Sequence, residues 1–191
     1  MSLDSNGVHT GIGADADLYQ ESVRRRCDKL RGKLFAYMRD NNIIGSEWLD
    51  VGAGKNYMRD ILPPRVISDN ETDLDSCPYK FQDKSFDLTT SFEVLEHLYN
   101  PLFHLRELRR VIKDNGSLIL VTPNDYSLIY KAEHLLSRKY RPHFHQFSER
   151  DLRDILSQAG FRIMHMEKFF KSRSGTLARI SRNGFFVHAK R

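Results

Sequence analysis

The spacing of apolar residues along the chain predicts a series of alternating helices and strands. From about Asp17 to Met38, apolar side chains recur at intervals of three and four residues, which places them on one face of a long helix. Shorter runs rich in apolar residues predict strands at 47–51, 66–69, 86–91 and 117–121. The last of these runs is almost continuously apolar, as a parallel strand covered on both faces requires.

Asn100 followed by Pro101 predicts the start of a second helix, because Asn caps helix N-termini and Pro suits the first helical position. We expect this helix to end before the turn residues Asp114-Asn115-Gly116. Four apolar residues form its inner stripe, namely Leu102, Leu105, Leu108 and Ile112.

Ser148 and Asp151 resemble the capping box of a later helix, which Gly160 ends. Residues 161–166 and 184–189 are then expected to form the last two strands. Because strands alternate with helices, the pattern predicts an α/β sheet rather than a helical bundle or a β-sandwich. Ligands on such sheets bind at the carboxyl ends of the strands.

The length of 191 residues corresponds to a single domain. A composition of 40% hydrophobic and 29% charged residues is typical of globular proteins and excludes disordered and collagen-like classes. The two cysteines, Cys27 and Cys77, belong to no CxxC or Cys/His motif, so we predict neither a disulfide framework nor a structural zinc site. No apolar run approaches the ~20 residues of a membrane span and no signal peptide is recognisable, which predicts a cytoplasmic protein.

The net charge of +5 is unevenly distributed. Residues 161–191 carry eight Lys or Arg side chains against one acidic side chain, Glu167, whereas the rest of the chain is slightly acidic. A basic segment of this kind is either a solvated face or a docking surface for an anionic substrate or a nucleic acid.

A glycine-rich turn, Asp50-Val51-Gly52-Ala53-Gly54, follows the first predicted strand. Glycines there permit a tight turn and let a ligand approach the backbone N–H groups at a helix start. The dinucleotide-binding fingerprint requires a third glycine at the position of Tyr57, so a nicotinamide or flavin cofactor is disfavoured. Asp50 would repel a pyrophosphate, but it would attract a ligand that carries an ammonium group.

Further motifs follow this turn in a fixed order. They are Asp69, Ser85-Phe86-Asp87-Leu88, Glu93-Val94-Leu95-Glu96-His97-Leu98, Arg110-Val111-Ile112-Lys113 with Gly116, Thr122-Pro123-Asn124 and Gly160-Phe161. With the glycine-rich turn, this set resembles the class I S-adenosylmethionine-dependent methyltransferases, and among them a small single-domain subgroup similar to the quinone-biosynthesis enzymes. The resemblance implies a Rossmann-like, doubly wound, mostly parallel sheet with an antiparallel C-terminal strand.

The resemblance also implies one methyltransferase domain over residues 1–191. Its expected parts are an N-terminal helical cap at 1–45, a cofactor-binding core at 46–123, a lid at 124–147, and a C-terminal helix and strands at 148–191. The segment from Asn124 to His145 is longer than a simple connection requires, and it is either a surface helix or a lid over the site.

S-adenosylmethionine is the cofactor that the resemblance implies. Gly52, Ala53 and Gly54 would contact its methionine end through the backbone, with Asp50 near the ammonium group. Asp69 would accept hydrogen bonds from both ribose hydroxyls, because each carboxylate oxygen can accept one.

Other positions complete the implied pocket. The adenine side is matched by Asn70, Asp73 and Leu74, and the wall of the methyl-transfer site by Ser91, Phe92 and Glu93. Tyr19 in the leading helix would close over the cofactor, or it would serve ordinary packing.

Two departures from the family pattern stand out. Asn56 occupies the position of the usual third glycine of the first motif. Asp73 comes only four positions after Asp69, where the family normally has a helix and a further strand. The helix after the second strand is therefore reduced, and either the third strand is vestigial or the adenine pocket is built differently.

Three histidines are candidate bases for an oxygen or ring-nitrogen acceptor, because imidazole titrates near neutral pH. His97 follows the strand expected at the transfer point, and His143 and His145 lie at the end of the expected lid. Alternatively, His97 caps a helix or faces the cofactor. The His-x-His pair could ligate a metal, but no nearby cluster of Asp, Glu or Cys supports one, and no metal is predicted.

The sequence therefore predicts methyl transfer to oxygen or nitrogen of a small-molecule or glycan-like acceptor. The basic C-terminal end favours an anionic acceptor. An RNA methyltransferase is one alternative. It is disfavoured because Ser91-Phe92-Glu93 stands where base-methylating enzymes have an Asn-Pro-Pro-Tyr motif. A protein that binds the cofactor without turnover is the other alternative, and the shortened region after Asp69 favours it slightly.

Overall fold

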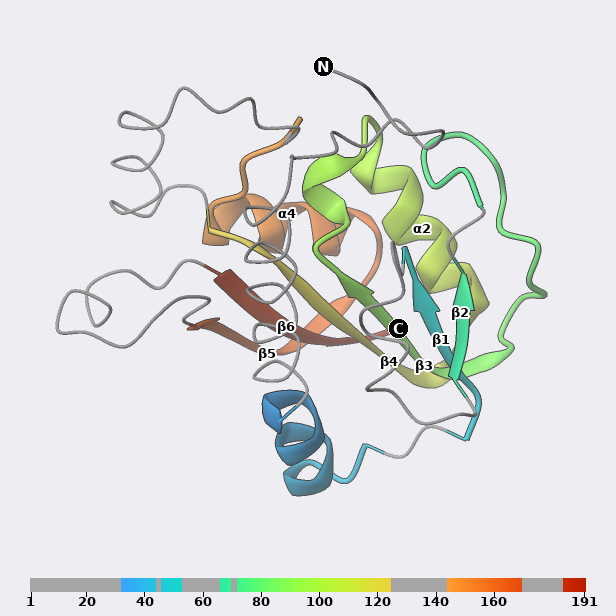
Figure 1. The fold of residues 1–191 in the computed structure, drawn as a ribbon, viewed down its shortest axis with the longest axis vertical. Helices are drawn as coiled ribbons and strands as arrows, with labels where there is room; N and C mark the ends of the chain where they lie inside the picture. The colour runs from blue at the N-terminus through green and yellow to red at the C-terminus, as the bar shows by residue number, and fades with distance from the viewer. Residues whose placement is uncertain (1–31, 44–45, 53–65, 70–71, 125–143, 170–183) are drawn as a thin grey trace, which may run out of the picture.

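Six strands form one sheet in the order β2-β1-β3-β4-β6-β5 in a computed structural model of the protein (Figure 1). The structure describes residues 32–43, 46–52, 66–69, 72–124, 144–169 and 184–191. The strands are β1 Trp48–Val51, β2 Val66–Asp69, β3 Phe86–Phe92, β4 Ile112–Pro123, β5 Arg162–Phe169 and β6 Gly184–Lys190. The helices are the segment 32–40, the 3-10 helix η1 Leu95–His97, α2 Pro101–Val111 and α4 Glu149–Gln158.

The strand directions confirm the predicted fold class. Strands β2, β1, β3 and β4 are mutually parallel, and β6 runs antiparallel between β4 and β5. The sheet is therefore mostly parallel with an antiparallel C-terminal strand. We call the side of the sheet where β1, β3 and β4 finish its carboxyl end, and the side where these strands begin its amino end.

Helices cover both faces of the sheet (Figure 1). Along β1, Leu49 and Val51 pack into the larger core with apolar residues of α2 and α4, whereas Trp48 packs into a smaller core with Leu34 and Met38. Consecutive strand residues point to opposite faces, so Asp50 shares the face of Trp48, which the helical segment 32–40 covers.

The predicted helix caps are confirmed. The side chain of Asn100 accepts a hydrogen bond from the Phe103 N–H at the start of α2. Ser148 and Asp151 form a complete capping box at α4, and Gly160 follows that helix with a φ of +84°. In the described part of the chain, no helix has the length and apolar composition to span a membrane.

Helix α2 ends at Val111, before Asp114-Asn115-Gly116 as predicted, but the assignment of Ile112 to this helix was wrong. Ile112 belongs to β4, where it pairs with Phe86, instead of completing the inner stripe of the helix. The register between β3 and β4 shifts after this pair, so the strand contains an irregularity where a turn was expected. Gly116 suits this crowded place, because a Cβ atom there would lie 2.9 Å from the backbone oxygen of Asp87.

Residues 72–85, which connect towards β3, form turns with neither a helix nor a strand. This agrees with the expected reduction of the region after the second strand. Hydrogen bonds from two residues, the cap residue Asn100 and Arg110 of α2, fix these turns against the helix. The Asn100 N–H donates to the Asp75 carboxylate at 2.7 Å, and the Arg110 guanidinium donates to the backbone oxygens of Tyr79 and Phe81, each at 2.9 Å.

Candidate active site

The backbone at the carboxyl end of β1 requires glycine. Gly52 follows β1 directly and has a φ of +75°, a region that favours glycine. A Cβ atom at this position would lie 2.4 Å from Cγ2 of Val94, which is too close for any side chain. Gly52 therefore lets the end of β1 lie close to Val94 in the segment that follows β3, with the tight backbone geometry that the glycine-rich motif predicted.

Asp50 carries a buried carboxylate in which only one of the two oxygens has a hydrogen-bond partner among the described residues. Its Oδ1 accepts a hydrogen bond from the Thr90 hydroxyl at 2.6 Å, and the same hydroxyl oxygen accepts from Nε1 of Trp48 at 3.1 Å. Its Oδ2 has no hydrogen-bond partner among the described residues. Burial raises the pKa of Asp50 to about 7, although the Thr90 hydrogen bond lowers it. A cation at Oδ2 would stabilise the ionised carboxylate.

The ends of β3 and β4 are joined at Glu93. This residue has a φ of +59°, which is uncommon for a residue other than glycine, and its N–H donates to the Val121 oxygen at 2.8 Å. Such conformations persist where the surrounding structure imposes them, and they are frequent at functional sites. Glu93 was predicted to wall the methyl-transfer site, and its backbone leaves β3 at the carboxyl end of the sheet.

Glu96 organises the segment beyond β3. It is fully buried, and its Oε2 accepts a hydrogen bond from the Thr122 hydroxyl at 3.0 Å. Its backbone oxygen accepts from the N–H groups of Phe144 and His145, at 2.8 and 3.2 Å. Glu96 thus joins η1, the end of β4 and the start of the segment 144–148.

The predicted base candidates His97 and His145 flank this arrangement. The side chain of His97 is 41% exposed, and its Nε2 lies 3.9 Å from Oε1 of Glu96. His145 is half-buried, with its ring tilted against Phe147 at 5.9 Å between centroids. The His97 imidazole thus lies near the Glu96 carboxylate, whereas His145 is tied to Glu96 through its backbone N–H, and neither side chain is fully buried.

A buried hydrogen-bond chain lies on the other face of the sheet, below the carboxyl end. Nε2 of His104 in α2 bonds to the Ser91 hydroxyl at 3.0 Å, and its Nδ1 bonds to the Tyr79 hydroxyl. Burial lowers the pKa of His104 to about 3, so the imidazole is neutral and joins two hydroxyl groups. The chain connects β3 to the turns of residues 72–85.

The predicted residues are only partly covered by the structure. The described ones are Asp50, Gly52, Asp69, Asp73, Leu74, Ser91, Phe92, Glu93, His97 and His145. Tyr19, Ala53, Gly54, Asn70 and His143 lie outside the described residues. Ser91 and Phe92 are buried, and Phe92 belongs to the smaller core.

For Asp69 the structure describes the backbone position, and for Asp73 it also describes the side-chain contacts. The backbone of Asp69 ends β2 and pairs with Val51, which places it beside the turn at Gly52. Asp73 is exposed, and its carboxylate accepts from the Ser76 hydroxyl at 2.5 Å and from the Asp75 N–H at 2.9 Å. These hydrogen bonds lower the pKa of Asp73 and cap a turn. Leu74 packs against the larger core.

Three contributors were missed from the sequence: Thr90, Glu96 and His104. Glu96 and His104 look like surface residues of helices, and Thr90 like any strand residue. The alternation in β3 could have placed Thr90 on the same face as Asp50, if the pairing of β1 with β3 had been known.

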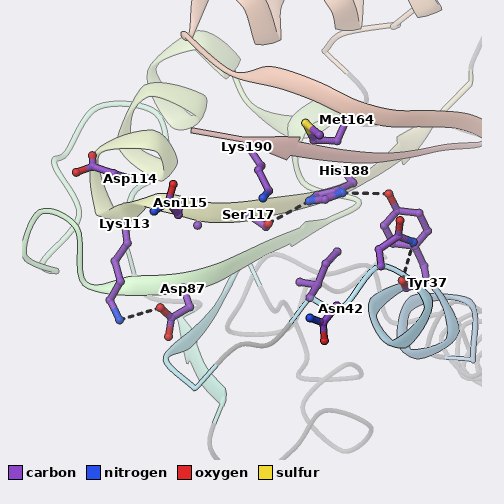
Figure 2. A pocket seen from close by; sticks show the side chains of 13 residues that line it. Tyr37, Asn42, Asp87, Lys113, Asp114, Asn115, Ser117, Met164, His188 and Lys190 are labelled. Carbon is purple, nitrogen blue, oxygen red and sulfur yellow. Dashed lines mark hydrogen bonds and ion pairs between the residues drawn. The ribbon is translucent and has the colours of Figure 1, made fainter.

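A cavity of about 560 Å³ lies at the opposite, amino end of the sheet (Figure 2). Its wall includes Tyr37 of the helical segment, Ser117 of β4 and His188 of β6. The His188 ring bonds to the Tyr37 hydroxyl and to the Ser117 hydroxyl, each at 3.0 Å. Burial lowers the pKa of His188 to about 4, with smaller effects of Lys190 and His165. None of the predicted site residues lines this cavity.

Among the described residues, no group of three or more His, Cys, Asp or Glu side chains is placed to hold a metal ion.

The features at the carboxyl end fit S-adenosylmethionine. Its ammonium group can be received by the open oxygen of Asp50, and its methionine end can approach the backbone at Gly52, where no side chain intervenes. Asp69 starts from the neighbouring strand at the same end of the sheet.

Comparisons with known proteins identify the family. The chain belongs to the methyltransferase domain family, whose profile matches residues 19–166. An S-adenosylmethionine-dependent methyltransferase of Clostridium acetobutylicum has a similar structure, with a TM-score of 0.65 and 12% identity over 92% of this chain and 97% of that chain. The expected methyltransferase family and Rossmann-like fold are therefore confirmed.

Two further proteins show how far the similarity extends, one in structure and one in sequence. The [4+2]-cyclase SpnF matches with a TM-score of 0.53 and 18% identity, over 75% of this chain and 73% of that chain. At such identities the solved structures show a shared fold. An uncharacterized protein of Methanocaldococcus jannaschii is 49% identical over 49 residues, which are 26% of this chain and 21% of that protein. The chain thus spans about a fifth of that curated relative.

Proposed function

We propose that the protein transfers a methyl group from S-adenosylmethionine to an oxygen or nitrogen atom of an acceptor. The observation that carries this proposal is the pair Asp50 and Gly52 at the carboxyl end of β1. A buried carboxylate with an open oxygen attracts an ammonium group, and the glycine leaves room for a ligand beside the backbone. Membership of the methyltransferase domain family supports the same function.

Asp69 is proposed to hold the ribose. Its backbone pairs with Val51, one residue before Gly52, so a ligand at the turn after β1 would reach β2 next. A carboxylate can accept one hydrogen bond from each of two neighbouring hydroxyls.

The residues around the acceptor would align it and remove its proton. When bound, S-adenosylmethionine supplies a methyl group on a sulfonium sulfur, and a thioether is the leaving group. The acceptor oxygen or nitrogen would take this methyl group as the thioether leaves, and a base of this chain would take the acceptor's proton. We propose His97 or His145 as this base or as an orienting group, since both lie beside Glu96. His143 stays a third prediction.

We further propose a small-molecule or glycan-like acceptor, including anionic ones, for a cytoplasmic enzyme whose subgroup resembles the quinone-biosynthesis methyltransferases. The proposed organisation is a single domain with a lid at 124–147. RNA is disfavoured as an acceptor, because Ser91-Phe92-Glu93 stands where base-methylating enzymes have an Asn-Pro-Pro-Tyr motif.

A second candidate is another reaction, or cofactor binding alone, at the same site. SpnF has this fold and is named a [4+2]-cyclase, so the fold by itself does not define methyl transfer. The turns at 72–85, which replace a helix and a strand, are the feature of this chain that favours the alternative.

Titration calorimetry with S-adenosylmethionine and with its demethylated product tests cofactor binding. We expect both to bind, and Asp69→Ala to weaken binding at least about tenfold, the loss of hydrogen bonds to a charged group. Asp114→Ala is the matched control, because this exposed carboxylate lies at the amino end and pairs with Lys84. Absence of binding to the wild-type protein would refute the proposal.

Transfer of labelled methyl groups then separates the two candidates. Methyl transfer predicts labelled product in a small-molecule fraction, and an RNA methyltransferase would label RNA instead. If the cofactor binds but no label leaves it with any acceptor fraction, the second candidate is favoured.

A further inference from the structure

An aromatic pair stands exposed beyond the carboxyl end of β3. The rings of Tyr99 and Phe144 are stacked, with centroids 4.2 Å apart and an interplanar angle of 28°. Tyr99 is nevertheless 73% exposed and Phe144 49% exposed. In the described ranges, Met164 is the other large apolar side chain with comparable exposure, and it lines the cavity at the amino end. We call Tyr99 and Phe144 the aromatic platform.

The platform is attached to the ends of the parallel strands. The N–H of Phe144 donates to the backbone oxygen of Glu96 at 2.8 Å, and the buried carboxylate of Glu96 accepts from Thr122 near the end of β4. The neighbouring residue Val121 binds the Glu93 N–H at the end of β3. A continuous set of hydrogen bonds therefore joins the platform to the end of the sheet where the cofactor is proposed to bind.

Because the two rings are stacked on each other and still exposed, they favour a ligand that contains a third aromatic ring. Stacking with each other already limits their motion, so little further side-chain freedom is lost when a ligand covers them. Covering their open surfaces removes apolar area from water, and a ring stacked on them adds a favourable aromatic contact.

The neighbours of the platform suit a ring with a polar substituent. His97 precedes Tyr99 by two residues and is 41% exposed, while His145 adjoins Phe144. Each imidazole can donate or accept one hydrogen bond at a ring hydroxyl or ring nitrogen. Two stacked rings offer a small area, which fits a ligand of one or two rings better than an extended protein partner.

We propose that the aromatic platform binds the ring of an aromatic acceptor, a phenol or a nitrogen heteroaromatic compound. The proposal rests on the proposed methyltransferase function for the identity of its ligand as an acceptor. Tyr99 and Phe144 would hold the ring, and His97 or His145 would contact the hydroxyl or ring nitrogen. The platform is thus a specificity site for aromatic over saturated acceptors.

Saturation-transfer NMR with two matched probes tests this specificity. The probes are 2-naphthol and its fully saturated analogue decahydro-2-naphthol, each titrated into the full chain in the presence of demethylated cofactor. We expect 2-naphthol to bind about 2- to 12-fold more tightly, the range that aromatic stacking adds. Tyr99→Leu should abolish this preference, and Tyr99→Phe, which keeps the ring, should retain it.

Controls separate the platform from general apolar binding. Met164→Leu at the amino end should leave the preference unchanged. Equal binding of both probes, or an unchanged preference in Tyr99→Leu, would overturn the proposal. So would sedimentation that shows a dimer in the wild type and a monomer in Tyr99→Leu, because the platform would then be an interface between copies.

Titration calorimetry with S-adenosylmethionine distinguishes the two proposals. If Tyr99→Leu binds the cofactor as the wild type does and loses only the aromatic preference, both proposals stand. If the wild type binds no cofactor yet discriminates between the probes, the platform is an aromatic site and the proposed function fails.

Discussion

Asp50 and Asp87 lie on neighbouring parallel strands at opposite ends of the sheet, and the pKa values of their carboxyl groups are shifted in opposite directions. Asp87, at the amino end, accepts from the Ser46 hydroxyl at 2.6 Å, the Glu47 N–H at 3.1 Å and the Lys113 ammonium at 2.9 Å. The Ser46 hydrogen bond and then Lys113 lower its pKa to about 2. The carboxyl of Asp50 has one hydrogen bond, and burial raises its pKa to about 7.

The difference shows what each end of the sheet does. At the amino end, further pairs such as Lys84 with Asp114 at 2.8 Å satisfy charges within the protein. At the carboxyl end, an acidic oxygen is buried without a described partner, which costs stability unless a ligand completes it. We infer that the amino end is structural and the carboxyl end is prepared for a cation.

Replacing the glycine at each end gives the largest expected effect. Gly52→Ala should destabilise the protein by about 2–4 kcal/mol, because it forces a side chain to positive φ and against Val94. Gly116→Ala should destabilise it too, since its Cβ would meet Ile112 Cγ2 at 2.6 Å. Chemical denaturation measures both.

Cofactor affinity should then separate these two variants. Folded Gly116→Ala is expected to bind S-adenosylmethionine as the wild type does, and folded Gly52→Ala is expected to bind it poorly. If both variants bind equally well under folding conditions, the glycine at the carboxyl end has no role in ligand approach.

The two aspartates provide the next comparison. Asp50→Asn should weaken cofactor binding about 10- to 100-fold, the loss of a charged contact, while Asp87→Asn should leave it unchanged. Asp87→Asn should instead lower the free energy of unfolding by about 1 kcal/mol, since its pairs are partly screened by solvent. Calorimetry and thermal unfolding of the same samples measure both effects. A reversed pattern would place the cation site at the amino end.

The raised pKa of Asp50 makes cofactor binding dependent on pH. Below about pH 7 the carboxyl is protonated in the free protein, and a bound ammonium group would stabilise its ionised form. Binding should therefore release up to about one proton near pH 6.5 and tighten as pH rises to 8. Calorimetry in buffers of different ionisation enthalpy measures this proton, and Asp50→Asn should release less.

The stability of the ligand-free protein should show the same group with the opposite sign. The folded pKa of Asp50 lies above its unfolded value of about 3.9, so ionisation costs folding free energy as pH rises between them. Relative to Asp50→Asn, the wild type should lose stability from pH 4 to 7. A constant difference between the two proteins over this range would contradict the assignment.

The last comparison concerns the turns at 72–85. Tyr79→Phe removes one hydroxyl from the buried chain with His104 and Ser91, at a cost of about 1–2 kcal/mol in the free energy of unfolding. Tyr99→Phe, which removes an exposed hydroxyl, is the matched control and should change stability little. Hydrogen exchange at residues 72–85 should quicken only in Tyr79→Phe.

Local signals in the sequence predicted the strands, the caps at Asn100 and Ser148, and the turn glycine Gly52. These features depend on residues close together in the chain, where propensity and capping rules apply. Ile112 was wrongly assigned to α2 because it suits the apolar stripe of that helix, whereas its pairing with Phe86, distant in sequence, places it in β4.

The candidate site was predictable in location and less so in chemistry. Asp50 was expected near a cation, but its raised pKa follows from burial in the fold, and the hydrogen bond that opposes this rise comes from Thr90, forty positions away. Glu96 and His104 act through partners on other elements, so no local pattern reveals them. The aromatic platform likewise joins residues 99 and 144, which only the fold brings together.

The position of β6 has a consequence for synthesis of the chain. It lies inside the sheet between β4 and β5, although it follows both in the sequence, and in the described residues β5 pairs with β6 alone. A nascent chain released residue by residue would present β4 and β5 with unpaired backbone until residues 184–190 emerge. Such exposed strand edges are prone to self-association, and the insertion of residues 184–190 between β4 and β5 protects them.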